Sequence, residues 1–103
     1  MGINPRRKAI TFGDDIYFRD VGAFDPNTAR GLGAIGHEIT HSAQYEAMGG
    51  ILNFTSAYVA EYNYLRGLGY DQEKAYRNIS FEVIAYARQD AITKTLGASG
   101  LPP

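Results

Sequence analysis

The chain contains only two histidines, His37 and His41, and they enclose Glu38 in the stretch GHEITH. On a helix, residues four apart lie on the same face about one turn apart, so both imidazoles can point at one ion. Two neutral imidazoles suit zinc. Glu38 is rotated by about 100° around the same helix, toward the side where a water on the ion would lie, which places it as a general base. The pattern predicts a zinc centre that hydrolyses amide bonds.

A catalytic zinc normally has three protein ligands and one open position. The sequence holds no third histidine and no cysteine, so the third ligand must be a carboxylate. Two glutamates are candidates. Glu61 lies 20 residues after His41, and Glu82 lies 41 residues after it with Ala85 one turn further on. Tyr86, one turn after Glu82, is a candidate for stabilising an oxyanion.

The elements that must position these residues are mostly helical. Apolar periodicity predicts helices over about residues 26–48, 51–68, 71–78 and 81–96. Asp25 is the expected N-cap of the first helix, and Leu32, Ile35, Ile39 and Ala43 are its expected apolar face. Gly33 and Gly36 cost that helix about 1 kcal/mol each relative to alanine, which predicts a closely packed neighbour.

Two β-prone runs, at residues 9–12 and 16–18, are separated by Gly13, Asp14 and Asp15 and predict a short hairpin. Its second strand is expected to be an edge that aligns an extended peptide substrate. The expected fold class is therefore α+β: a mostly helical single domain over residues 1–103, with a small N-terminal β-hairpin or edge sheet.

Composition restricts the possible partners. The chain is 45% hydrophobic and 20% charged, which is ordinary for a globular domain. A net charge of −1, with no basic run beyond Arg6, Arg7 and Lys8, argues against nucleic acid as a partner. No stretch approaches the 18 or more apolar residues of a membrane span, and no apolar leader follows the first charges. The expected location is cytoplasmic by default, with signal-less export as the alternative.

Three stretches carry a family resemblance: ITFGDDIYFRDVGAFDP, GLGAIGHEITHSAQYEAMGG and RNISFEVIAYARQ. Together they resemble the metallopeptidase domain found in proteins of extracellular contractile injection systems and in bacterial toxins, over about residues 9–90. The group is similar to minimal gluzincins, which are zinc peptidases with a glutamate as third ligand. The resemblance implies that His37 and His41 are ligands, that Glu38 is the base, and that Glu82 rather than Glu61 is the third ligand. It also implies a minimal zincin with an active-site helix and a glutamate helix.

The sequence departs from that group at one informative position. Similar short zincins often read E-x-x-A-D, whereas Tyr86 follows Ala85 here, so this motif supplies no carboxylate to orient a ligating histidine. In similar minimal gluzincins a C-terminal segment can occupy the cleft, so the tail at about 97–103 is expected to be mobile or inhibitory. The alternative function is a catalytically silent, zinc-stabilised binding module of a secretion or toxin assembly, or a latent zymogen.

Overall fold

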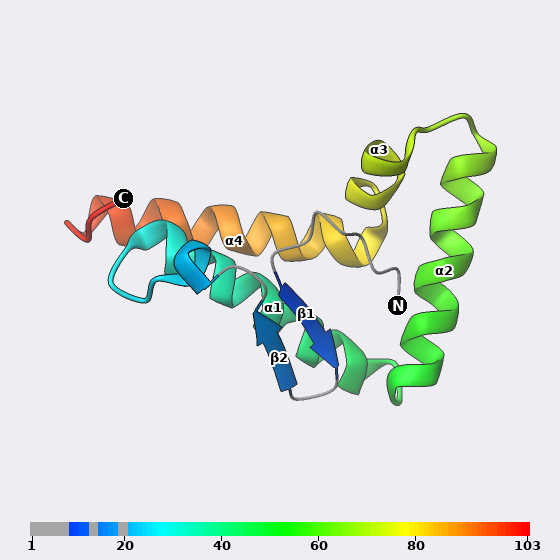
Figure 1. Cartoon of the computed structure of the whole chain (residues 1–103), viewed down its shortest axis with the longest axis horizontal. Helices are drawn as coiled ribbons and strands as arrows, with labels where there is room; N and C mark the ends of the chain where they lie inside the picture. Colours follow the sequence, from blue (N-terminus) through cyan, green and yellow to red (C-terminus); the bar gives the residue numbers. More distant parts are fainter. Residues whose placement is uncertain (1–8, 13–14, 19–20) are drawn as a thin grey trace.

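Two long helices that run in opposite directions form the centre of the fold (Figure 1). The computed structural model describes residues 9–12, 15–18 and 21–103. Their elements, in chain order, are β1 (Ala9–Phe12), β2 (Asp15–Phe18), a 3-10 turn (Val21–Phe24), α1 (Ala29–Ala47), α2 (Ile51–Gly67), α3 (Gln72–Arg77) and α4 (Ser80–Ala98). The most extensive contact joins α1 to α4, while α2 stands apart at one end and α3 leads back to α4.

The α+β class expected from the sequence is wrong, because the packed body of the protein is helical. Within the described residues, strand pairing is confined to β1 with β2, which lie antiparallel with Thr11 opposite Ile16. Two strands of four residues do not make a sheet layer on which helices could pack. The fold is therefore held by helix-to-helix contacts.

The first turn of α1 is capped by Thr28, three residues later than the sequence predicted. The Thr28 hydroxyl accepts a hydrogen bond from the Gly31 N–H at 3.0 Å. Asp25, the expected cap, instead accepts from the Asn27 N–H at 2.9 Å and so stabilises the turn before the helix. Asp71 caps α3, since its carboxylate accepts from the Lys74 N–H at 2.8 Å.

The close neighbour predicted from the two glycines of α1 is α4. A Cβ placed on Gly33 would overlap the Thr93 hydroxyl and lie 2.9 Å from the Gln89 carbonyl oxygen. A Cβ on Gly36 would overlap the Ile92 side chain. The prediction is confirmed: the glycines allow the backbones of the two helices to approach closely.

The buried face of α1 differs from the apolar stripe expected from the sequence. Ile39 is 56% exposed, whereas the charged or polar side chains of His37, Glu38 and His41 are buried. Burying polar groups is tolerated only where they find partners. The polar face of α1 thus points inward because Gln89 and Glu82 of α4 supply hydrogen-bond partners for the two histidines.

An aromatic cluster attaches α2 to the rest of the molecule. Its buried members are Tyr45, Phe54, Tyr58, Tyr76 and Ile79. Phe54 lies at its centre, with ring centroids 4.4 Å from Tyr45 on α1 and 4.5 Å from Phe81 on α4. These contacts hold α2 against one end of the α1–α4 pair.

The C-terminal tail, expected to be mobile or inhibitory, lies at the start of α1. The Pro102 carbonyl accepts a hydrogen bond from the Ala29 N–H at 2.7 Å. At 1.5 Å rise per residue, this contact is about 12 Å along the helix axis from His37. In the described residues, no helix combines the length and apolar character that a membrane crossing requires.

We predict that Gly33→Ala lowers the free energy of unfolding by about 1–2 kcal/mol. The helix gains about 1 kcal/mol in propensity. This gain is outweighed because the added methyl meets the Gln89 backbone oxygen, which cannot swing aside like a side-chain end. Urea denaturation measures the difference.

The matched control is Gly97→Ala in α4, where a Cβ would meet no atom within 4 Å. It should leave stability unchanged or raise it slightly, since only the propensity changes. Equal effects of the two substitutions would show that the close approach of α1 and α4 is not what Gly33 provides.

Candidate metal centre

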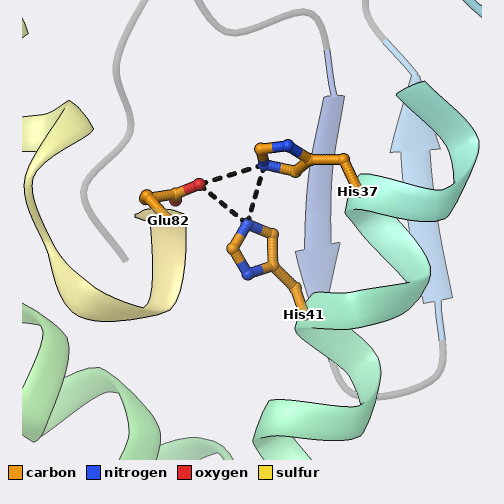
Figure 2. Close-up of side chains that lie close together, drawn as sticks. All are labelled: His37, His41 and Glu82. Atoms are coloured by element: carbon orange, nitrogen blue, oxygen red, sulfur yellow. Dashed lines mark hydrogen bonds and ion pairs between the residues drawn. The ribbon is translucent and has the colours of Figure 1, made fainter. Parts of the chain in front are cut away.

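Three ligand atoms from two helices converge between α1 and α4 (Figure 2). Nε2 of His37 and Nε2 of His41 each lie 3.0 Å from Oε1 of Glu82, and the two nitrogens are 3.2 Å apart. Glu82 is fully buried, at 0% exposure, and both imidazoles are buried. The helical spacing places the histidines on one face of α1, and the first turn of α4 brings the glutamate to them.

The triangle of ligand atoms has the dimensions of a metal site. A tetrahedral zinc ion with bonds of about 2.0–2.1 Å holds its ligand atoms about 3.3 Å apart. The three observed separations, 3.0, 3.0 and 3.2 Å, are close to that value. The donor set, two imidazoles and one carboxylate, is also one that zinc uses in catalytic sites. The residues present therefore fit the ion.

The hydrogen bond at Nδ1 of each imidazole determines whether Nε2 of the same ring can bind a metal ion. Nδ1 of His37 lies 2.8 Å from the amide oxygen of Gln89, and Nδ1 of His41 lies 2.8 Å from that of Gln44. An amide oxygen only accepts hydrogen bonds, so each Nδ1 must carry the proton. The orientation of Gln44 is set independently, because its NH2 group donates to the Phe81 carbonyl at 3.0 Å. In the neutral rings, both Nε2 atoms are thus lone-pair donors.

The lone pairs of the two Nε2 atoms and of Glu82 Oε1 repel one another unless a positive charge lies between them. Oε1 of Glu82 faces two imidazole lone pairs, while its Oε2 accepts a hydrogen bond from the Tyr58 hydroxyl at 2.7 Å. Among the described residues, Glu38 and Glu82 are buried and no lysine or arginine is. A divalent cation would balance the two carboxylates and bind all three lone pairs.

The pKa of His41 is raised in the metal-free protein. Burial is the largest single influence on the pKa of His41 and lowers it, whereas the hydrogen bond and the negative charge of Glu82 raise it. The hydrogen bond to Gln44 and the charge of Glu38 add smaller upward contributions, so the net pKa of His41 is raised above its usual value. The same groups that favour this proton would favour a metal ion in its place.

Glu38 and Tyr86, the expected catalytic residues, both lie beside His37. Oε2 of Glu38 is 3.9 Å from Nε2 of His37, and the side chain is 5% exposed. The Tyr86 ring contacts the His37 ring edge-on, with centroids 4.4 Å apart. The Tyr86 hydroxyl lies 3.3 Å from that of Tyr76, and the Arg77 guanidinium lies 4.6 Å from the centre of the Tyr86 ring. These contacts pack Tyr86 against His37, and its role in stabilising an oxyanion stays a prediction.

Glu61, the alternative third ligand, has a different task. Its two carboxylate oxygens accept from the Ser80 N–H at 2.9 Å and the Ser80 hydroxyl at 2.8 Å. The residue that precedes α4, Ile79, forms no side-chain cap, so Glu61 supplies from α2 the acceptor that the helix start lacks. Of the two candidate glutamates, the structure brings only Glu82 to the histidines.

Three residues that contact the ligands received no role from the sequence: Gln44, Tyr58 and Gln89. Gln44 is one turn after His41, and Gln89 is two turns after Glu82, so helical spacing from the proposed ligands could have found both. Tyr58 belongs to the apolar stripe of α2, and no spacing rule distinguishes its hydroxyl from those of neighbouring tyrosines. It is identified only by the contact with Glu82.

Comparison with known proteins gives one match. No curated protein and no solved structure matches the chain. Residues 4–49 match the family described as the eCIS core domain. The match covers less than half of the chain and includes His37, Glu38 and His41 but not Glu82. It confirms the expected association with extracellular contractile injection systems, and the peptidase activity stays a prediction.

Proposed function

We propose that the protein is a zinc-dependent peptidase. The observation that carries this proposal is the convergence of His37, His41 and Glu82 within 3.2 Å, with Glu38 next to them on the same helix turn. Three nitrogen and oxygen ligands from the protein are typical of a catalytic zinc, which keeps a fourth position open. Structural zinc sites usually have four protein ligands, often thiolates, and this chain has no cysteine.

Glu38 performs the proton transfers in this proposal. Zinc, when bound, polarises a water and lowers its pKa to about 7. The Glu38 carboxylate takes the proton of the attacking water and then passes it to the leaving amine. His37 and His41 hold their Nε2 lone pairs toward the ion throughout, because their Nδ1–H groups are held by Gln89 and Gln44.

One observation favours a second candidate, a zinc-stabilised module without catalysis or in a latent form. The side chains of all three ligands and of Glu38 are buried, with Glu38 the most exposed at 5%. A peptide can approach such a site only after a conformational change. The eCIS core domain match supports a setting in an injection system for either candidate.

We predict that the protein binds one zinc ion through Glu82 and not through Glu61. Glu82→Gln should reduce the zinc association constant by more than about 100-fold, because it removes a charged ligand. Substitution of a residue that only supports a ligand typically reduces metal affinity by about 10–100-fold. Competition titration against a chelator of known affinity measures the change.

Glu61→Gln is the matched control, since within the described part of the chain the Glu61 carboxylate accepts from Ser80 and does not contact the histidines. It should keep the zinc affinity of the wild type even if it weakens the start of α4. A loss of zinc in Glu61→Gln with retention in Glu82→Gln would reverse the assignment of the third ligand.

Glu38→Gln should keep the zinc but lower hydrolysis by about 10²–10⁴-fold, because the amide cannot take the proton. Zinc-loaded wild type and variant are incubated with a diverse peptide mixture, and new termini are read by mass spectrometry. Glu46→Gln, at an exposed position of the same helix, is the control and should cleave like the wild type. Equal cleavage by Glu38→Gln and wild type would remove Glu38 as the base; no cleavage by zinc-loaded wild type would favour the second candidate.

The stability of the metal-free protein should fall as pH rises. His41 has a raised pKa in the folded state, so its contribution is fully present below the unfolded value of about 6.5 and is lost as pH rises through the folded pKa. Zinc competes with the same proton, so zinc affinity should rise over that range. Urea midpoints at several pH values, with and without zinc, test both trends. In His41→Asn the slope attributed to this proton should disappear; an unchanged slope would assign it to another group.

A further inference from the structure

The structure assigns Gln44 and Gln89 as positioning residues that fix the direction of the two imidazole ligands with uncharged acceptors. This inference rests on the proposed metal site but not on peptidase activity. Neither residue contacts the ligand atoms themselves: each accepts the Nδ1–H of one histidine at 2.8 Å, on the side of the ring away from Glu82. Each therefore acts through the histidine that it holds.

Each of the two glutamines joins α1 to α4, one from the α4 side and the other from the α1 side. Gln89 on α4 holds His37 on α1. Gln44 on α1 holds His41 on the same helix and donates its NH2 group to the Phe81 carbonyl on α4. Because Phe81 immediately precedes Glu82, the second contact also fixes the glutamate relative to the histidines. The direction of all three ligands thus depends on two amides.

Charge explains why these acceptors are amides. Histidine ligands of metals commonly donate Nδ1–H to a carboxylate or a backbone carbonyl. Here Glu38 and Glu82 already bring two negative charges into a buried region that, within residues 22–103, contains no buried lysine or arginine. One divalent ion balances those two charges, whereas carboxylates at positions 44 and 89 would add two more. Amides give the same direction without the additional charge.

The two positions differ in what they require. Among the described residues, the side chain of Gln89 makes one hydrogen bond, in which its oxygen accepts from His37. Gln44 accepts from His41 and donates to the Phe81 carbonyl, and an ionised carboxylate cannot do both because it only accepts. A glutamate can therefore replace Gln89, but at position 44 it would set a carboxylate oxygen against a carbonyl oxygen.

The test compares zinc affinity among Gln89→Leu, Gln89→Glu, Gln44→Leu and Gln44→Glu, by competition with a chelator. Both leucine variants should bind zinc about 10–100-fold more weakly than the wild type. Gln89→Glu should bind zinc at least as tightly as the wild type, because it keeps the acceptor and makes the imidazole more basic. Its additional buried charge should instead lower the free energy of unfolding of the metal-free protein. Gln44→Glu should bind more weakly than Gln89→Glu. Gln72→Leu, at an exposed position of α3, is the matched control and should not change the affinity.

A second measurement separates positioning from a general loss of structure. In zinc-loaded, 15N-labelled protein, the Nδ1–H of His37 should exchange slowly with water in the wild type and rapidly in Gln89→Leu, while that of His41 stays slow. Gln44→Leu should show the reverse. Leucine variants with the zinc affinity of the wild type, or with both Nδ1–H groups equally affected, would overturn the inference. Wild type that binds zinc but cleaves no peptide would reject the proposed activity and leave this inference standing.

Discussion

Two imidazole lone pairs and a carboxylate oxygen meet between α1 and α4, at separations of 3.0–3.2 Å, and in the neutral rings no proton lies between them. This arrangement is repulsive unless a cation is present, because each of the three atoms is an acceptor. Either the packing of the fold holds these three acceptors together against their repulsion, or a proton or a metal ion between them removes the repulsion. Burial lowers the pKa of His41, but the hydrogen bond and charge of Glu82 oppose this effect and the pKa is raised, so a proton on this ring is favoured by the same carboxylate. Folding and cation binding are coupled through this point.

The close approach of α1 and α4 is what makes the convergence possible. Gly33 lets the Gln89 backbone come near α1, and the Gln89 side chain then reaches Nδ1 of His37. A larger residue at position 33 would separate the helices where that hydrogen bond crosses between them. The glycines, which look unfavourable for a helix on propensity alone, thus help to bring together the three residues that could hold a metal. The close approach of α1 and α4 thus determines both the packing of the two helices and the geometry of the three converging side chains.

The sequence predicted the site better than the fold. Two histidines at i,i+4 spacing point the same way on any helix, so their convergence follows from local geometry. The buried face of α1 could not be found from hydropathy, because His37 and Glu38 are polar and are buried by partners distant in sequence, whereas Ile39 is exposed. For the same reason the first-turn cap was misplaced: Asp25 and Thr28 are both good caps, and tertiary contacts select between them. The hairpin led to the wrong class because local β propensity says nothing about whether a sheet layer forms.

The burial of the site favours a noncatalytic or latent module, whereas the number of protein ligands favours a zinc peptidase. Burial concerns the access of a substrate, and ligand number concerns the coordination of the ion. Burial of Glu38 and the ligands limits the access of a peptide. Ligand count concerns the coordination of the ion, and among the described residues the group that could hold a metal has three members, His37, His41 and Glu82. Access can change when the helices or the covering residues move, whereas the three ligand atoms are held together by the packing of α1 against α4. The count of three nitrogen and oxygen ligands among the described residues therefore favours the proposed catalytic zinc over a structural one, and the burial of these side chains favours the latent form of that proposal.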